Sequence, residues 1–284
     1  MSVIGKSHFR PSLKFSPVLA TEAIQMLSPD RVYIWRVSLD SSAPSAAHLA
    51  SWRAMLSAEE LSKSQKFRSE KLRHDYIASH AALRTVLGRC LDISPASVQF
   101  ANGPVSENKG ELAKATTIKP ALLLAKDSGN QPENLRFNLS HTRGAALIGV
   151  ALGRELGVDI EWHRPLDDLQ DMAKYVMSKP ELEQWLSMPS VEQISGFYRV
   201  WTRKEAYLKA IGLGLYRSLH AVTVGASASL QESRSDEAFL VQDDCAAGSW
   251  TVRDIPASIG SSASVCCEGA GTFNLVVEDL DIFF

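Results

Sequence analysis

Short apolar runs at several places along the chain predict β-strands. These runs are rich in valine, isoleucine and aromatic residues, which fit a pleated and partly buried surface. They cover residues 32–37, 136–139, 145–152, 158–162, 222–224, 250–252 and 274–277. Only a short segment beginning at Gly153 separates 145–152 from 158–162. We therefore expect these two runs to form a hairpin.

Other segments carry the start signals and spacing of α-helices. Ser57 and Glu60 form a capping-box pattern, and apolar residues at helical spacing continue to about Leu91, whether or not the helix breaks on the way. Similar boxes at 178–181 and 190–193 predict two further helices, the second ending near Ile211. Residues 102–134 mix Gly, Asn, Pro and Ser, and predict a long loop with one short strand at 121–125.

The mixed order of helices and strands predicts an α+β fold rather than a purely parallel sheet. A chain of 284 residues can form one large domain or two medium ones. The helix-then-strand order occurs once in each half, which indicates an architectural duplication without a detectable sequence repeat.

Charge and composition exclude several classes of protein. A net charge of −2 argues against a dedicated nucleic-acid binder. No stretch approaches the roughly 20 apolar residues of a membrane span, and the N-terminus lacks the apolar run of a signal peptide. The 4 cysteines show neither zinc spacing nor a disulfide framework, which favours a reducing cytoplasm.

Two carboxylates alternate along one predicted strand. Asp159 and Glu161 are two apart and therefore share a face, while Val158, Ile160 and Trp162 face the other way. Two neighbouring carboxylates repel unless a cation or solvent separates them, and a hard cation such as Mg²⁺ takes oxygen ligands of this kind. A solvated face of an edge strand is the alternative.

A lysine interrupts the apolar stripe of the predicted helix near 190–211. Lys204 lies between Val200 and Leu208 on that stripe, and Glu205 lies on its flank. Buried charges need partners, so this break in the pattern indicates a functional position. An ion pair between Glu205 and Lys209, four residues apart in the favourable order, is the alternative.

Three motifs occur in an order that resembles one enzyme family. Residues 137–141 are Phe-Asn-Leu-Ser-His, 157–161 are Gly-Val-Asp-Ile-Glu, and 201–210 contain Trp-x-x-Lys-Glu-x-x-x-Lys, followed by a glycine loop at 212–215. This series resembles the surfactin-type 4′-phosphopantetheinyl transferases. The resemblance covers about 56–224 and implies their fold, which has two similar α/β subdomains related by a pseudo-two-fold axis. We expect these subdomains at 1–152 and 153–284.

The resemblance implies roles for the acidic and basic residues of the last two motifs. Asp159, Glu161 and Glu205 are implied to ligate Mg²⁺, with Mn²⁺ as a substitute ion. Lys204 and Lys209 are implied to hold the diphosphate of coenzyme A, the co-substrate.

Further positions resemble the family's coenzyme A contacts. Ser140 and His141 correspond to contacts with the nucleotide phosphates, although His141 alone could equally be a structural histidine at a strand end. The basic residues correspond to contacts with the rest of the nucleotide, including its 3′-phosphate: Lys63, Lys66, Arg68 and Lys119.

The chain also departs from the family pattern. Ile118 replaces the glycine before Lys119, and 108–117 resembles an insertion. Glu60 stands where a further lysine is frequent, so recognition of the 3′-phosphate could be shared differently. Leu213 stands where the glycine loop often has a lysine.

The implied reaction transfers phosphopantetheine from coenzyme A to a serine hydroxyl of an apo acyl or peptidyl carrier protein. Adenosine 3′,5′-bisphosphate leaves. Lys204 and Lys209 would stabilise developing charge together with the metal, and Glu205 is our candidate base, a role that competes with metal ligation. We expect a cytoplasmic monomer that engages neither nucleic acid nor membrane.

Several alternatives remain open. A nucleotide hydrolase that depends on Mg²⁺ is disfavoured because the chain has no Walker-type loop. A non-catalytic module that binds coenzyme A or a carrier protein is the second alternative. Glu181 could be a site residue, although its capping box with Ser178 is the favoured interpretation, and Met172, Val176 and Met177 are expected in the core rather than in a groove for the protein substrate.

Overall fold

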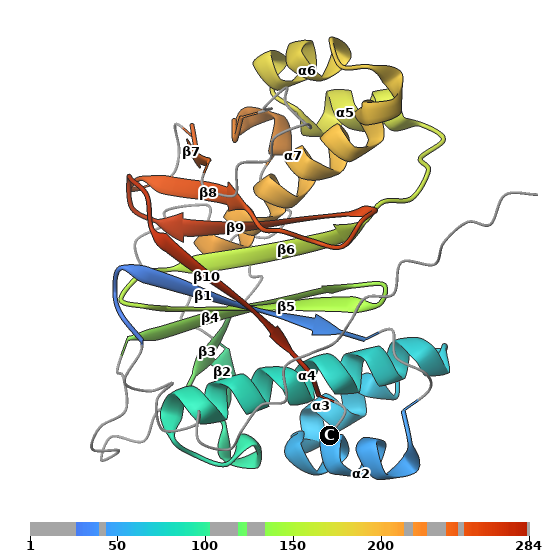
Figure 1. The fold of residues 1–284 in the computed structure, drawn as a ribbon, viewed down its shortest axis with the longest axis vertical. Helices are drawn as coiled ribbons and strands as arrows, with labels where there is room; N and C mark the ends of the chain where they lie inside the picture. The colour runs from blue at the N-terminus through green and yellow to red at the C-terminus, as the bar shows by residue number, and fades with distance from the viewer. Residues whose placement is uncertain are drawn as a thin grey trace, which may run out of the picture.

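Two sheets lie between two layers of helices (Figure 1). The computed structural model describes residues 27–39, 44–102, 119–123, 134–212, 218–225, 237–243 and 247–282. The first helical layer consists of α2 (Ala46–Met55), α3 (Ala58–Ser64) and α4 (Glu70–Leu91). The last consists of α5 (Leu169–Val176), α6 (Lys179–Leu186) and α7 (Ser190–Ile211). This mixture of elements confirms the predicted α+β class.

The first sheet has the strand order β10, β1, β5, β4. Its strands are β1 (Arg31–Ser38), β4 (Leu135–Thr142), β5 (Ala145–Leu152) and β10 (Asn274–Leu280). β10 runs parallel to β1, and the other pairs are antiparallel. The first sheet therefore contains the last strand of the chain beside strands from its first half. The division at 152/153 and the pseudo-two-fold relation stay predictions.

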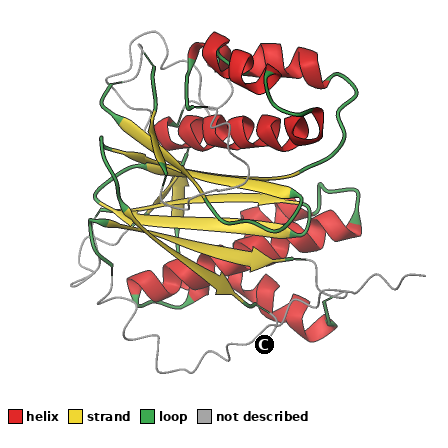
Figure 2. Cartoon of the chain, turned by 45° about the horizontal axis from the view of Figure 1, so that its top comes forward, coloured by secondary structure: helices red, strands yellow, loops and turns green. Residues whose placement is uncertain are grey.

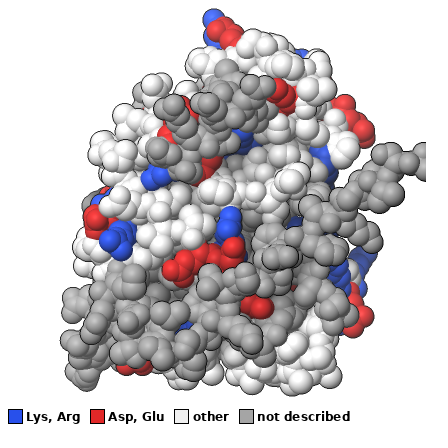
Figure 3. Space-filling model, in the orientation of Figure 1, with Lys and Arg blue, Asp and Glu red and all other residues white. Residues whose placement is uncertain are grey.

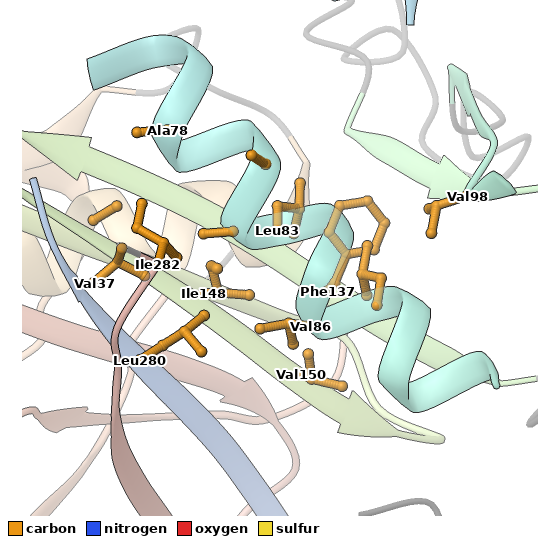
Figure 4. Packing of buried hydrophobic residues seen from close by; sticks show 14 of the residues in the cluster. Val37, Ala78, Leu83, Val86, Val98, Phe137, Ile148, Val150, Leu280 and Ile282 are labelled. Carbon is orange, nitrogen blue, oxygen red and sulfur yellow. The ribbon is translucent and has the colours of Figure 1, made fainter. Parts of the chain in front are cut away.

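Helix α4 covers the outer face of the first sheet. Figure 4 shows Leu83 and Val86 of α4 pointing at Phe137, Ile148 and Val150 of the sheet, all of which are buried. Large apolar side chains that interlock in this way supply most of the stability of such a layer.

The second sheet has the order β6, β9, β8, β7, with every pair antiparallel. Its strands are β6 (Leu156–Trp162), β7 (Ala238–Leu240), β8 (Trp250–Asp254) and β9 (Ser261–Glu268). Helix α7 crosses β6 and β9 on the outer face, as the view in Figure 2 also shows. A third apolar cluster, which includes Val158, Ile160 and Leu147, fills the space between the two sheets.

The edges of the two sheets meet along β4 and β6. The side chain of Asn138 on β4 accepts the backbone N–H of Val158 at 2.9 Å, and the hydroxyl of Thr142 accepts that of Trp162 at 3.2 Å. Side chains thus satisfy backbone donors that a neighbouring strand would otherwise satisfy. We call this junction of β4 and β6 the seam.

Several sequence predictions are confirmed and others are wrong. The predicted hairpin of 145–152 with 158–162 is wrong, because β5 pairs with β1 and β4 whereas β6 pairs with β9 in the other sheet. Alternation identifies a strand but not its partner. The late strand at 222–224 is also wrong, since only an isolated bridge joins Thr223 to Gln242.

The predictions of where helices begin are likewise partly confirmed and partly wrong. The box of Ser57 and Glu60 caps α3, and a break before α4 interrupts the predicted helix. The box at 190–193 is wrong, because Pro189 occupies the N-cap position of α7 and no side chain caps it. Strand β9 was not predicted. It contains many Ser, Ala and Cys residues, which suit a strand packed between a helix and another sheet.

Smaller elements complete the described chain. β2 (Phe100–Asn102) pairs with β3 (Pro120–Leu122), close to the short strand predicted at 121–125, and Pro95–Ser97 and Leu219–Ala221 form short 3₁₀ turns. No helix among the described residues is long and apolar enough to cross a membrane. On the face drawn in Figure 3, acidic and basic side chains are interspersed.

Candidate active site at the seam between the sheets

A buried acid, a lysine and a serine meet at the middle of the seam. Asp159 on β6 is only 3% exposed. Its Oδ1 lies 2.6 Å from Nζ of Lys209 on α7 and accepts the hydroxyl of Ser140 on β4 at 2.9 Å. Lys209 also donates to Ser140 Oγ at 2.9 Å. Three elements thus bring one polar group each to a single point.

The negative charge of Asp159 acts on the other two predicted carboxylates, Glu161 and Glu205. Burial and then the charge of Asp159 raise the pKa of Glu161, whose Oε2 accepts the hydroxyl of Thr142 at 3.4 Å. Burial raises the pKa of Glu205 to about 7, with further contributions from Asp159 and Glu161 and opposition from Lys209. β6 and α7 therefore bring the three acidic residues of the two motifs into one neighbourhood.

Two carboxylate oxygens in this neighbourhood are buried and have no hydrogen-bond partner among the described residues. They are Oδ2 of Asp159 and Oε1 of Glu205. Buried acceptors in proteins are normally satisfied, and a divalent cation satisfies several carboxylate oxygens at once. As they stand, the described side chains do not form a group of three or more acidic, histidine or cysteine residues that could hold a metal ion. The orphaned oxygens and the type of donor nevertheless fit a hard cation.

The packing of α7 against β6 places these groups. A Cβ atom on Gly157 would lie 2.1 Å from the carbonyl oxygen of Ala206 and 2.4 Å from the backbone nitrogen of Ala210. Only a glycine permits this approach of helix to strand. Glu205 and Lys209 each directly precede one of these contact residues, so the close crossing holds both beside Asp159.

Lys204 lies elsewhere. Its side chain is fully buried, and Nζ is 2.6 Å from Oε2 of Glu181. It also donates to three backbone carbonyl oxygens at 2.6–2.9 Å, those of Val176, Leu219 and Val222. Burial lowers the pKa of Lys204, and Glu181 opposes that shift. The diphosphate role predicted for Lys204 therefore finds no support in this geometry, which brings Lys209 and not Lys204 to the acids.

Glu181 acts as a helix cap, as the favoured interpretation predicted. Its Oε2 accepts the backbone N–H of Ser178 at 2.8 Å, and its Oε1 accepts that of Val224 at 2.7 Å. Val176 and Met177 are buried in the core beside α7, and Met172 packs against it, also as expected.

His141 follows Ser140 near the end of β4 and is exposed. Desolvation lowers its pKa, and the nearby charges of His80 and Lys209 lower it further, whereas Asp75 opposes them. The charges that act on His141 therefore come from both α4 and α7.

The remaining basic candidates lie on or after α3 and directly before β3. Lys63 is exposed on α3 and pairs with Glu59 at 3.0 Å, while Lys66 and Arg68 are exposed in the turn after α3. Lys119 lies 2.6 Å from Oε2 of Glu155 and donates to the carbonyl of Leu156 at 2.7 Å.

Lys119 thereby holds the start of β6. Burial would raise the pKa of Glu155, but Lys119 and Arg136 outweigh it and lower that pKa. The proposed phosphate contact of Lys119 stays a prediction. Leu213 and the segment 108–117 lie outside the described residues.

Sequence reasoning missed two features of the site. Asn138, Ser140 and Thr142 alternate along β4, and this pattern could have predicted the seam. The second feature is the group formed by Glu60, His80 and Arg84, which joins α3 to α4. Nothing in the local pattern marks it, because Glu60 lies 20 residues before His80 and 24 before Arg84.

The fold and the site define an α+β protein whose cluster of acids and a lysine, set between two sheets, suits phosphate chemistry. The profile of the 4′-phosphopantetheinyl transferase superfamily matches residues 155–258. The chain is 35% identical to 4′-phosphopantetheinyl transferase HetI of Nostoc sp. over 191 residues, which are 66% of this chain and 72% of HetI. It is 33% identical over 173 residues to 4′-phosphopantetheinyl transferase ffp of Bacillus subtilis, covering 60% of this chain and 71% of ffp.

A more distant relative is 4′-phosphopantetheinyl transferase Sfp of Bacillus subtilis (strain 168), at 25% identity over 171 residues, which are 60% of this chain and 66% of Sfp. The chain belongs to the 4′-phosphopantetheinyl transferase family, and the resemblance seen in its motifs is confirmed.

Proposed function

We propose that this enzyme transfers the 4′-phosphopantetheine group of coenzyme A to a serine hydroxyl of an apo acyl or peptidyl carrier protein. Adenosine 3′,5′-bisphosphate is the second product. The observation that carries the proposal is the cluster of Asp159, Lys209 and Ser140 at the seam, with Glu161 and Glu205 in the same electrostatic neighbourhood. Such a cluster offers both cation ligands and a phosphate-binding ammonium.

A magnesium ion, or Mn²⁺ in its place, would be held by Asp159, Glu161 and Glu205. The orphaned oxygens of Asp159 and Glu205 support this assignment. When bound, the ion would neutralise charge on the oxygens of the diphosphate.

The protein's own groups account for the remaining chemistry. The serine oxygen attacks the β-phosphorus of coenzyme A, and the bond from that phosphorus to the oxygen bridging it to the α-phosphate breaks. The Lys209 ammonium would bind the leaving phosphate and offset its growing charge. Ser140 would donate a hydrogen bond there once a phosphate displaces its contact with Asp159.

The serine proton needs an acceptor. Glu205 is the candidate, because its pKa of about 7 suits proton exchange near neutral pH and its Oε1 has no hydrogen-bond partner in the described part of the chain. Metal ligation by the same carboxylate competes with this role. No nucleophile from the enzyme is required.

The wider parts of the proposal concern the substrate site and the assembly. His141, Lys63, Lys66, Arg68 and Lys119 would contact the nucleotide of coenzyme A, and the halves 1–152 and 153–284 would form the two sides of the site. We propose a monomer. The three described cysteines are free and buried, which supports a reducing, cytoplasmic setting.

Carrier-protein loading tests the proposal. Apo carrier proteins of fatty-acid, polyketide and nonribosomal peptide type are incubated with the enzyme, coenzyme A and Mg²⁺, and their intact masses are measured. We expect the mass of one phosphopantetheine to be added, and we expect chelator or Glu205→Gln to reduce the rate by at least about a hundredfold. Glu192→Gln, on the same helix, is the matched control and should load at the normal rate.

A second readout does not depend on turnover. Mg²⁺ should raise the melting temperature of the wild-type protein more than that of Glu205→Gln, because the ion relieves repulsion among carboxylates. If the protein binds coenzyme A but loads none of the carrier types, the transferase proposal is wrong, and a non-catalytic binding module is the better interpretation.

A further inference from the structure

Three polar side chains of β4 face β6 in succession. Asn138, Ser140 and Thr142 are two residues apart, so they share one face of the strand. Asn138 accepts the backbone N–H of Val158, and Ser140 donates to Asp159. Thr142 makes the third contact, at the end of the seam. The proposed reaction uses Ser140 but gives Thr142 no task.

The hydroxyl of Thr142 makes two hydrogen bonds whose directions are fixed. A backbone N–H can only donate, so the Thr142 oxygen accepts from the N–H of Trp162, at 3.2 Å. The single hydrogen of the hydroxyl is left for Glu161, whose Oε2 accepts it at 3.4 Å. One side chain thus ties the end of β6 to β4 and holds one oxygen of the carboxylate.

Glu161 differs from Asp159 in how it is held. Asp159 has the shorter side chain, is 3% exposed and contacts two neighbouring side chains through Oδ1. Glu161 is longer and only partly buried, and among the described residues its carboxylate receives a hydrogen bond from Thr142 alone. The positive charges of Lys209 and Arg164 also act on Glu161, but neither donates a hydrogen bond to it. The direction of this carboxylate therefore depends on Thr142.

A carboxylate that is held in this way suits a cation. Carboxylates that ligate metals are commonly held by hydrogen bonds from a second group, and loss of that group lowers metal affinity by about tenfold to a hundredfold. The bond from Thr142 engages Oε2 of Glu161, so Oε1 can face the cation. The same cation would satisfy the orphaned oxygens of Asp159 and Glu205.

We propose that Thr142 is a positioning residue that orients Glu161 for the divalent cation of the transfer reaction. The inference rests on the proposed function, in which Asp159, Glu161 and Glu205 hold that ion. Thr142 acts through Glu161 and not by contact with coenzyme A. Removing its hydroxyl should weaken the binding of the cation and leave the reaction at saturating Mg²⁺ almost unchanged.

Thr142→Val tests the proposal, since valine has nearly the shape of threonine but no hydroxyl. We expect the Mg²⁺ concentration that gives half-maximal carrier loading to rise by about tenfold. We expect kcat at saturating Mg²⁺ to fall by less than about threefold. Thr142→Ser keeps a hydroxyl and should need Mg²⁺ at a concentration within about twofold of that of the wild type.

Metal binding is also measured without a carrier protein. Mg²⁺ is added in the presence of coenzyme A, and the concentration at which the melting temperature begins to rise should be about tenfold higher for Thr142→Val. Thr85→Val is the matched control, because Thr85 of α4 is also partly buried and, among the described residues, its hydroxyl contacts only Ala81 and Met55. This variant should leave both Mg²⁺ dependences unchanged.

Two results would overturn the proposal directly. One is a lower melting temperature of Thr142→Val with both Mg²⁺ dependences unchanged, since Thr142 would then only support the backbone at Trp162. The other is a fall in kcat that saturating Mg²⁺ does not relieve. If the wild-type protein loads no carrier, the transferase proposal fails, and the melting curves still decide the role of Thr142. If Mg²⁺ does not raise the melting temperature of the wild-type protein, Glu161 holds no ion and this proposal fails, whether or not carriers are loaded.

Discussion

Two lysines five residues apart on α7 show how position decides the role of a side chain. Both were predicted to bind phosphate. Lys204 is instead enclosed by Glu181 and three carbonyl oxygens, whereas Lys209 is 29% exposed at its side chain and contacts Asp159. The break in the apolar stripe correctly indicated that Lys204 needs a partner, but the partner comes from α6.

Removing each lysine should therefore have a different effect on stability and on activity. Lys204→Met leaves Glu181 buried and uncompensated, so we expect the free energy of unfolding to fall by about 3–5 kcal/mol. Lys209→Met should cost less, about 1–3 kcal/mol, because Lys209 is itself partly exposed although its partner Asp159 is buried, yet it should slow carrier loading by more than about tenfold. Urea unfolding and loading rates measure the two effects. Equal destabilisation by both changes would contradict this division of roles.

At the scale of elements, the site depends on how closely α7 crosses β6. Gly157 lies under the helix at the point between Glu205 and Lys209, so helix position and carboxylate position are coupled. The glycine of the Gly-x-Asp-x-Glu motif thus has a packing role, which is distinct from the chemical role of the two acids after it.

Gly157→Ala tests this coupling. The added methyl group cannot fit 2.1 Å from the Ala206 carbonyl oxygen, so α7 must shift. We expect a loss of about 1–3 kcal/mol from overpacking and a clear fall in loading per folded molecule. Gly153→Ala is the control, because that glycine has φ of 68° with nothing within 4 Å of an added Cβ. Gly153→Ala should lower the free energy of unfolding by a similar amount, about 1–2 kcal/mol, and leave the loading rate unchanged.

At the scale of the whole molecule, the two halves of the chain are interlocked. The middle core joins the inner faces of both sheets, and β10 leaves the second half to pair with β1. The indole N–H of Trp52 on α2 also donates to the carbonyl of Ile282, 3.1 Å away. The sheet under the first helical layer therefore contains a strand from the second half of the chain, and that layer also bonds directly to the segment after β10.

We accordingly expect the described core to unfold in one transition. Hydrogen exchange in increasing urea, read by mass spectrometry, should show α4 and α7 losing protection at the same midpoint. Separate midpoints for the two helices would show that the halves are independent folding units. Removing residues 274–284 should lower the midpoint of both helices together, since it takes β10 from the first sheet.

The sequence determined the class of the fold, most strands, the course of α4 and α7, and the shared face of Asp159 and Glu161, because each follows from local spacing and capping. It also identified the family. Only the tertiary structure decided that β5 and β6 belong to different sheets, that Lys204 is an internal cation of the fold, and that Glu60 pairs with His80 and Arg84. These outcomes depend on contacts between residues far apart in the chain, which no local pattern encodes.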